Sequence, residues 1–271
     1  MLFRIHVPGP PLRGLIESFT LVVDPEYPYE REQLLPDGRV YLLINLGPHE
    51  HFAVLPGETR RRPYRRAWLS GERRGPTVIE RARHGYDLVI VQFRPGAASA
   101  FFGFPLSEVT DRVVELEEIW GRSAVDEMVS RLLERPDPNR RLAELERILG
   151  ERLLGSGPSP LICGALGLMD RADLAIGMRE IASRLGASQT TVIREFRQHV
   201  GLTPKLLQRI LRFQRAIALE STRSLTWTQI AHRCGYYDQA HMSREFRIFA
   251  DRSPGAYSAA RAEYPNYVPV P

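Results

Sequence analysis

An internal repeat of about 50 residues in the C-terminal part constrains the fold of this sequence most. Residues 194–197 read Arg-Glu-Phe-Arg, and the same four residues recur 50 positions later at 244–247. The pair Ile-Ala at 181–182 recurs 49 positions later at 230–231. Ordered matches at a nearly constant offset indicate one structural unit used twice.

Each repeat has the pattern of a helix-turn-helix. In the first repeat, a short helix over residues 178–185 should end at Gly186, because glycine readily adopts a positive φ after a helix. Ser188 should then cap a second helix. The second repeat follows the same plan, with a helix over residues 227–234 and Asp238 as the next cap. The predicted inward positions of the two second helices are Val192, Phe196 and Val200, and Met242, Phe246 and Phe249.

The residues left on the outer faces of these second helices suit DNA. Arginine can form paired hydrogen bonds with guanine and glutamine with adenine, and Ser or Thr hydroxyls contact phosphate. We predict that Arg194 and Arg244 contact bases and that Arg197 and Arg247 contact phosphates. The full predicted DNA-binding set is Ser188, Gln189, Thr190, Thr191, Arg194, Arg197, Asp238, Gln239, Ala240, His241, Arg244 and Arg247.

A helix over residues 204–220 should hold the two repeats apart. Two helices that enter successive major grooves need a rigid spacer, since the grooves recur about every 34 Å. The predicted buried positions of this spacer are Leu206, Leu207, Ile210, Leu211, Phe213, Ile217, Ala218 and Leu219.

The charge of the chain supports the same partner. Residues 1–155 hold 22 Arg against 23 Asp and Glu, whereas residues 156–271 hold 15 Lys and Arg against nine Asp and Glu. The positive excess therefore lies entirely in the part that contains the repeat. A basic domain favours a polyanion, with nucleic acid ahead of an anionic membrane.

At these residues the sequence resembles the AraC/XylS family of bacterial transcription regulators, over about residues 172–257. The matching residues are Ile181, Ala182, Ser188, 194–197, Gly201, Thr203, Pro204, Arg212, Phe213, Ile230, Ala231, Gly235, Tyr236, 242–247, Ser253, Pro254 and Tyr257. Asp251 stands where the family usually has glycine, and aspartate also tolerates left-handed backbone. The resemblance implies an all-α domain with two helix-turn-helix motifs, a double-stranded DNA partner, a homodimer, and RNA polymerase as a candidate partner.

The first 105 or so residues are rich in β-strand patterns. Apolar and β-branched runs at residues 15–23, 39–46, 51–55, 67–70, 77–81 and 87–93 are separated by Gly and Pro turns. Such spacing favours an antiparallel sandwich or barrel. Residues 35–38, 43–47 and 91–97 resemble a cupin-like sensor domain of one AraC subgroup, which implies a small β-barrel and a candidate ligand pocket. Four aromatic residues, Tyr41, Phe52, Trp68 and Phe93, either line such a pocket or fill the core; the core is favoured.

Residues 122–134 and 139–154 have helical periodicity and predict a helical hairpin, because Pro136 and Pro138 separate them. The hairpin either packs on the β-rich domain or forms a dimer interface, and the sequence leaves both open.

Other candidate sites have weaker patterns. His49-Glu50-His51 could begin a metal site with Glu58 and His84, but its spacing fits no known ligand pattern and a solvated turn is favoured. Residues 60–62, 65 and 66 are all Arg; we expect an exposed loop balanced by acids rather than an anion site or a second DNA contact. Cys234 aligns with Leu185 of the first repeat and should be buried.

Together these patterns predict an α+β multidomain chain. We expect a cupin-like antiparallel β-barrel over residues 1–120, a helical hairpin over 121–155, a linker over 156–160, a double helix-turn-helix domain over 161–262 and a Pro-rich tail over 263–271. The sequence contains no catalytic or nucleotide-binding motif, so we expect no enzyme, catalytic residue, cofactor or metal. With no signal peptide and no apolar run long enough for a bilayer, we expect a cytoplasmic protein without a membrane partner.

The predicted function is sequence-specific transcription regulation, controlled by a small-molecule effector at the N-terminal domain through residues that the sequence does not identify. Two alternatives stay open. The N-terminal domain could serve only in dimerisation or protein interaction, or it could be a cupin-type metalloenzyme fused to a DNA reader.

Overall fold

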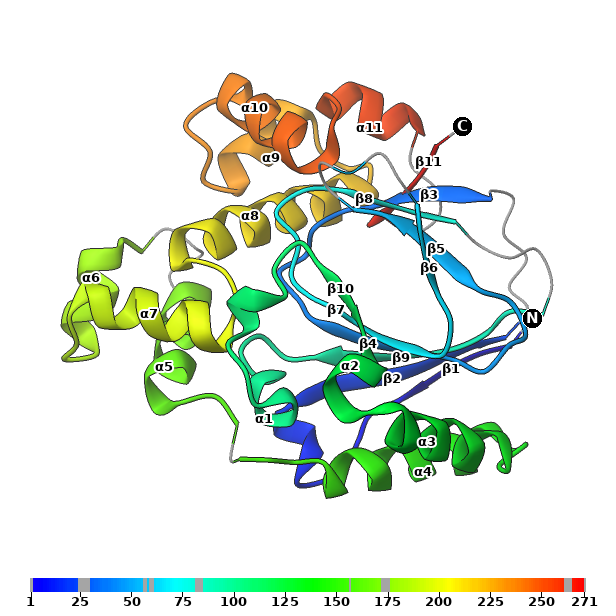
Figure 1. Ribbon diagram of the computed structural model, residues 1–271. Helices are drawn as coiled ribbons and strands as arrows, with labels where there is room; N and C mark the ends of the chain where they lie inside the picture. Colours follow the sequence, from blue (N-terminus) through cyan, green and yellow to red (C-terminus); the bar gives the residue numbers. More distant parts are fainter. Residues whose placement is uncertain are drawn as a thin grey trace.

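The computed structural model describes residues 2–23, 30–55, 58, 61–80, 85–155, 157–171, 176–260 and 265–270. A β-domain lies at the centre of the molecule, with a helical hairpin on one side and a helical C-terminal domain on the other (Figure 1). None of the described helices combines the length and the apolar composition needed to cross a bilayer.

The β-domain consists of two antiparallel sheets that face each other as the walls of an open barrel (Figure 1). The first sheet has the order β1 (Leu2–His6), β2 (Ile16–Val23), β9 (Asp87–Phe93), β4 (Tyr41–Asn45), β7 (Ala67–Ser70) and β10 (Val113–Glu115). The second has the order β11 (Tyr267–Pro269), β3 (Arg31–Leu34), β8 (Thr77–Glu80), β5 (His51–Val54) and β6 (Arg62–Tyr64). All six predicted strands are present, and the antiparallel fold is confirmed; β1, β3, β6, β10 and β11 are additional.

Strand β9 shows how the first sheet separates two apolar layers. Val89 and Val91 are fully buried on the outer face, while Leu88 and Ile90 point into the space between the sheets. This alternation is the period of two that a strand buried on both faces requires. The first sheet therefore has an apolar core on each side.

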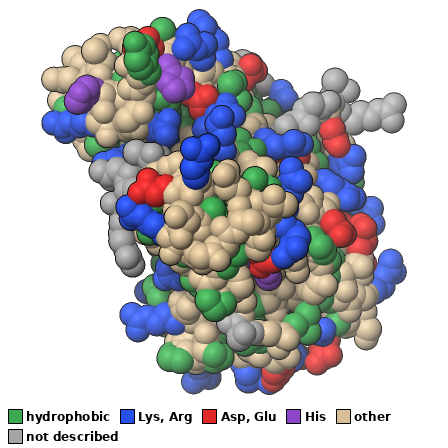
Figure 2. Space-filling model, turned by 90° about the vertical axis from the view of Figure 1, so that its left-hand side faces the viewer, with side chains coloured by type: hydrophobic (Ala, Val, Ile, Leu, Met, Phe, Trp, Pro, Cys, Tyr) green, Lys and Arg blue, Asp and Glu red, His purple; other side chains and the backbone are tan. Residues whose placement is uncertain are grey.

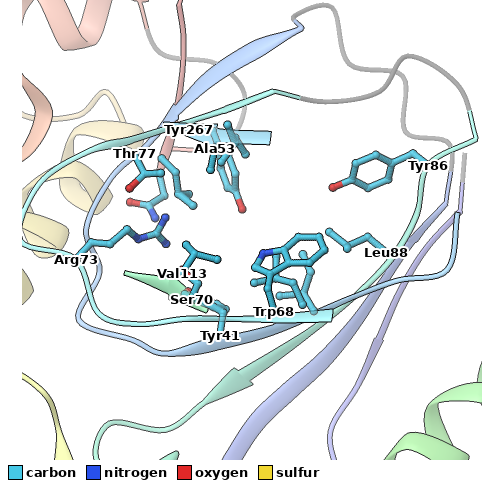
Figure 3. Close-up of a pocket in the computed structure, with 15 residues that line it drawn as sticks. Tyr41, Ala53, Trp68, Ser70, Arg73, Thr77, Tyr86, Leu88, Val113 and Tyr267 are labelled. Carbon is cyan, nitrogen blue, oxygen red and sulfur yellow. The ribbon is translucent and has the colours of Figure 1, made fainter. Parts of the chain in front are cut away.

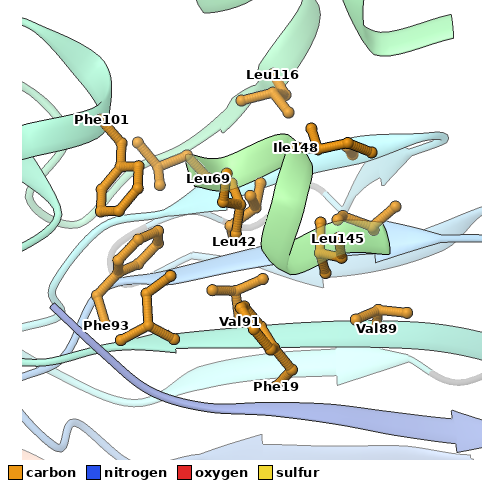
Figure 4. Close-up of a cluster of buried hydrophobic side chains, with 14 of the residues drawn as sticks. Phe19, Leu42, Leu69, Val89, Val91, Phe93, Phe101, Leu116, Leu145 and Ile148 are labelled. Atoms are coloured by element: carbon orange, nitrogen blue, oxygen red, sulfur yellow. The ribbon is translucent and has the colours of Figure 1, made fainter. Parts of the chain in front are cut away.

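The helical hairpin covers the outer face of the first sheet. It consists of α3 (Arg122–Leu133) and α4 (Pro138–Glu151), and Leu145 and Ile148 of α4 pack over Val89 and Phe19 (Figure 4). Shorter helices complete this layer: η1 (Leu12–Gly14), α1 (Ser99–Phe102), η2 (Leu106–Glu108) and α2 (Leu116–Trp120). The hairpin therefore packs on the β-domain, which is one of the two predicted uses; a dimer interface at the hairpin stays a prediction.

The C-terminal domain is all-α, as predicted. Its helices are α5 (Pro160–Arg171), α6 (Met178–Arg184), α7 (Gln189–His199), α8 (Pro204–Ser221), α9 (Trp227–Arg233), α10 (Gln239–Ala250) and α11 (Pro254–Ala260). The spacer helix α8 buries Leu207, Ile210, Phe213 and Ile217. Leu206, Leu211 and Leu219 are only half-buried and pack against the same core. The prediction for Ala218 is wrong: it is exposed and Ala216 is buried instead, because the two positions differ by about 200° around a helix.

The two domains are joined by contacts from both ends of the chain. Leu35, which follows β3, is fully buried within the core of the C-terminal domain. After α11 the chain returns to the β-domain as β11, where Val268 pairs with Gln33 of β3 and is itself fully buried. Gln214 of α8 donates to the carbonyl of Pro36 at 2.7 Å. The last strand of the barrel thus follows the helical domain in sequence.

A second set of contacts joins the end of α7 to the β-domain. Thr110 donates from its hydroxyl to the carbonyl of Gly201 at 2.8 Å, and the hydroxyl of Ser99 lies 3.0 Å from Nδ1 of His199. Gly201 has φ +87°, and a Cβ there would lie 3.1 Å from the carbonyl oxygen of Leu106 and 3.1 Å from Oγ1 of Thr110. Glycine is therefore required at position 201 for two reasons: its φ is positive, and atoms of the β-domain lie too close to leave room for a side chain.

Replacing Gly201 with alanine tests that junction. Gly186 also has a positive φ, +62°, but nothing lies within 4 Å of its Cβ position, so Gly186→Ala is the matched control. The backbone strain alone should lower the free energy of unfolding by about 1–2 kcal/mol in both variants. We expect Gly201→Ala to lose about 1 kcal/mol more in urea unfolding, because it also crowds the interface. An equal or smaller loss would contradict a tight junction.

Candidate nucleic-acid interface

Two helix-turn-helix units are present at the repeated sequences. The first consists of α6 and α7, and the second of α9 and α10. Gly186 and Gly235 follow the first helix of each unit with φ +62° and +70°, so the predicted turn glycines are confirmed. Asp251, which replaces the usual glycine, has φ +53° and ends α10 in the left-handed conformation that aspartate tolerates.

The two predicted N-caps hold the start of α7 and α10. The hydroxyl of Ser188 accepts a hydrogen bond from the backbone N–H of Thr191 at 3.0 Å. The carboxylate of Asp238 accepts one from the N–H of His241 at 2.6 Å. These caps satisfy backbone donors that the first helical turn leaves unpaired. They fix the direction in which each helix presents its first two turns.

The predicted contact residues lie on the open faces of these two helices. Arg194 of α7 and Arg244 of α10 occupy equivalent positions and are exposed; the Arg194 side chain is 70% exposed and lies 3.5 Å from Glu195. In the described part of the chain, Arg197, Arg244 and Arg247 have no ion-pair partner. Exposed are Ser188, Gln189, Thr190, Arg194, Arg197, Asp238, Gln239, Ala240, Arg244 and Arg247, and half-buried are Thr191 and His241.

Neighbouring side chains orient two polar residues at the start of α10. Thr228 donates from its hydroxyl to the side-chain oxygen of Gln239 at 2.8 Å. The ring of His241 stands edge-on to Tyr236, with centroids 5.4 Å apart, and its Nδ1 lies 3.4 Å from the N–H of Tyr237. Side chains held in this way lose less conformational entropy when they form a further contact.

The repeated glutamates, which we did not single out from the sequence, position the two units. Glu245 of α10 is buried and accepts two-pronged hydrogen bonds of 2.8–3.2 Å from Arg209 of α8. Its counterpart Glu195 contacts Ser159 at 3.5 Å and His199 at 3.6 Å. The repeat itself could have indicated these residues, because a glutamate lies between the same Arg and Phe neighbours in both copies.

A basic hollow lies between the spacer helix and α10. Its volume is about 470 Å³, and its walls include Lys205, Arg209 and Arg212 of α8 together with His241. Figure 2 views the molecule from the side that carries α6 and α7, and Lys and Arg side chains are spread over the upper half of this face. Positive charge is therefore available beside the recognition helices as well as on them.

The other candidate sites have structural roles in the described residues. The favoured solvated turn fits His49, which is exposed, but it is wrong for His51. His51 begins β5 and is buried between Trp68 and Tyr86, with Nε2 3.2 Å from the amide oxygen of Asn45. No cluster of three or more metal-ligating side chains occurs among the described residues. His84 and Arg60 lie outside the described residues.

The basic run is balanced by acids, as expected. Arg61 pairs with Glu80, Arg62 with Glu58, Arg65 with Glu50 and Arg66 with Asp126; the arginines are exposed and the acids half-buried. The predicted loop is wrong for Arg62, which lies in β6. Cys234 is buried, as predicted.

The β-domain contains a cavity between its two sheets. Its volume is about 100 Å³, and Tyr41, Trp68 and Tyr86 are among the residues that line it (Figure 3). Phe93 is instead fully buried in the outer core, and Phe52 packs against the guanidinium of Arg61. The favoured core position is therefore confirmed for Phe93, whereas Tyr41 and Trp68 line the cavity and Phe52 does neither.

Both the N-terminal and the C-terminal part of the chain match a known domain family. Residues 181–260 match a helix-turn-helix domain family, and residues 4–115 match a domain of unknown function (DUF6597). The transcriptional activator RhaS of Salmonella arizonae is 34% identical over 86 residues, which is 32% of this chain and 31% of that protein. RhaS of Salmonella paratyphi B is 36% identical over 74 residues, 27% of each protein. The matches thus span about a third of the length of these relatives.

One solved structure extends the likeness to the whole fold. The structure of ToxT from Vibrio cholerae aligns with a TM-score of 0.51 over 90% of this chain and 98% of its own length, at 10% identity. The order of a β-rich N-terminal domain and a double helix-turn-helix domain is therefore shared.

Removing the charge of Glu245 tests its role in positioning α10. Glu245→Gln leaves Arg209 without its buried partner and should lower the free energy of unfolding by about 2–3 kcal/mol. Glu180→Gln removes an exposed pair with Arg184 and should cost at most about 0.5 kcal/mol. Chemical denaturation of both variants measures the difference; equal losses would show that the pair does not hold α10.

Proposed function

We propose that this chain, which belongs to the AraC/XylS family through its C-terminal domain, is a sequence-specific DNA-binding transcription regulator. The observation that carries the proposal is the presence of two helix-turn-helix units with exposed arginines at equivalent positions, Arg194 and Arg244. Helices of this kind fit the major groove and read bases from their first turns.

In the proposed complex, α7 and α10 enter successive major grooves on one side of the duplex. The spacer α8 has 18 residues, which span roughly 27 Å of helix and suit grooves that recur about every 34 Å. Arg194 and Arg244 contact bases, with Gln189, Thr190 and Thr191 beside the first and Gln239 and His241 beside the second. Arg197 and Arg247 contact phosphates; the remaining members of the interface, Ser188, Asp238 and Ala240, lie at the helix starts.

We further propose that the N-terminal domain controls DNA binding through an effector. The cavity between its sheets is lined in part by Asn266 and Tyr267, which follow the DNA-binding domain in sequence. An occupant would therefore contact the segment that ties the two domains together. A ligand changes an equilibrium only by its difference in affinity for the two states, and this shared wall supplies such a difference.

The remaining attributes follow from this function. We propose a cytoplasmic protein without enzymatic activity, because it acts on chromosomal DNA and its recognised domain reads DNA. RNA polymerase is the partner that an activator of this kind would contact. Metal analysis of the purified protein tests the alternative of a metalloenzyme fused to a DNA reader.

A second candidate role for the N-terminal domain is dimerisation. Strand β1 is at the edge of the first sheet, and its Phe3 and Ile5 are 46% and 57% exposed. An edge strand with exposed apolar side chains is suited to pairing with a second copy. Phe3 also lines the hollow that Asn266 and Tyr267 line, so a second copy at this edge would contact the segment proposed for effector control.

Single arginine substitutions test the DNA interface. Arg244→Ala should weaken binding to a duplex selected from random sequence by about 1–3 kcal/mol and relax one base preference. Arg197→Ala should instead weaken binding to all duplexes and lower the salt dependence by about one phosphate contact. Fluorescence anisotropy measures both, with Arg140→Ala on α4 as a control for loss of one exposed charge. If Arg140→Ala and Arg244→Ala have equal effects, the interface is assigned wrongly.

A charge on β1 tests dimerisation. Ile5→Glu places a carboxylate on the exposed edge and should shift a dimer to monomer in light scattering, with little change in thermal stability. Leu133→Glu, at a 50% exposed position on the hairpin, is the control and should leave the dimer intact. The opposite pattern would assign the interface to the hairpin.

A further inference from the structure

The cavity of the β-domain has an apolar end and a polar end. Trp68 and Leu88 of the first sheet lie at one end, with Tyr86 beside them (Figure 3). Arg73, Ser70 and Thr77 lie towards the other end, where Tyr267 of β11 closes the wall. A site of this composition fits a ligand that has one polar group and a small apolar body.

Arg73 is the unusual member of this wall. It lies in the loop between β7 and β8, is 5% exposed and lines the cavity with its side chain. It forms no ion pair or hydrogen bond with the described residues. The hydroxyl of Thr77 is also buried and has no hydrogen-bond partner in the described part of the chain. A buried guanidinium without a partner is strongly destabilised, so this end of the cavity favours an anion.

Neither nearby carboxyl group forms an ion pair or hydrogen bond with Arg73 in the described part of the chain. Asp37 lies close enough for the charge of Arg73 to lower its pKa, although burial raises that pKa on balance. Its oxygens already accept from the hydroxyl of Tyr41 and from the N–H of Arg39. Glu72 is next to Arg73 in sequence, but it is directed at Gly201 of the neighbouring domain, and burial raises its pKa well above the ordinary value.

We propose that this cavity binds a small monocarboxylate, with the carboxylate on Arg73 and Thr77 and the apolar body against Trp68 and Leu88. The proposal rests on the proposed effector control and names the ligand class of that site. A guanidinium can form two parallel hydrogen bonds with a carboxylate, which fixes its direction as well as its position.

The size of the cavity limits the apolar body. An apolar cavity of about 150 Å³ accommodates benzene, and a water molecule occupies about 30 Å³ in the liquid. The cavity of about 100 Å³ therefore suits a carboxylate with a chain of roughly three to five carbons. Butyrate is the representative probe.

The position of the cavity makes its occupancy relevant to the DNA-binding domain. Asn266 and Tyr267 line this cavity and also an adjoining hollow of about 400 Å³, where Leu211 and Gln214 of α8 form part of the opposite wall. Asn266 further accepts a hydrogen bond from Gln214 at 2.7 Å. A bound carboxylate thus contacts the same segment that α8 contacts.

Calorimetric titration of the full chain with butyrate and with butyramide, at constant ionic strength, tests the proposal. We expect saturable binding of butyrate at one site and binding of butyramide at least about 10-fold weaker, because the amide lacks the charge that Arg73 requires. Arg73→Met should lower the affinity for butyrate by about 10- to 100-fold. The control Arg74→Met alters the adjacent exposed arginine, which pairs with Asp111, and should leave binding unchanged.

Further outcomes separate the possible errors. If Arg73→Met does not fold, Thr77→Val can be used instead. It removes the second hydrogen-bond donor and should lower the affinity for butyrate by about 3- to 10-fold. Equal affinity for butyrate and butyramide, or no binding by carboxylates from acetate to valerate, would overturn the proposal. If inorganic phosphate binds more tightly than butyrate, the claim that the ligand has an apolar body is wrong. The titration contains no DNA, so it tests the ligand site alone. If butyrate binds but leaves the affinity for DNA unchanged in a separate anisotropy measurement, effector control is contradicted and the ligand site stands.

Discussion

Burial of a β-domain residue inside the core of the DNA-binding domain is the interaction on which the whole arrangement depends. Leu35 is fully buried among the helices, and burial of a leucine side chain contributes about 1.5–3 kcal/mol. Val268 of β11 is fully buried in the same apolar cluster, although its backbone pairs with β3 of the second sheet. Two residues from strands of the second sheet or beside it therefore complete the core of the DNA-binding domain. Separating them would expose both residues to water, so the two domains are expected to be stabilised together.

The spacer helix α8 transmits this constraint to both helix-turn-helix units. One of its faces meets the β-domain through Leu207 and Gln214, and Arg209 elsewhere on the same helix binds Glu245 of α10. The end of α7 meets the β-domain separately, through Gly201. A change in docking would thus reach the second unit through α8 and the first through α7. Both recognition helices would respond to one event in the β-domain, although they are 50 residues apart in sequence.

Local patterns predicted the repeated units well, because their determinants lie within a few residues of each other. Turn glycines, N-caps and the apolar stripe of a helix all depend on short-range geometry, and Asp251 was assigned correctly for the same reason. Ala218 was misplaced because alanine carries too little apolar area to mark a face. Arg73 could not be distinguished from exposed Arg74, since only the distant strands that close the cavity decide which of the two is buried. Strand β11 was missed because three residues are too few to carry a strand pattern, and they form a strand only by pairing with β3.

The order in which β11 joins the barrel has a consequence for biosynthesis. Its partner β3 leaves the ribosome before the DNA-binding domain, whereas β11 follows that entire domain. During translation the edge of the second sheet is therefore unpaired, and the cavity wall that Tyr267 supplies is missing. Contacts between residues so far apart in sequence form slowly, and an open strand edge is prone to aggregation in the meantime. The second sheet of the N-terminal domain would thus be complete only after β11 is made.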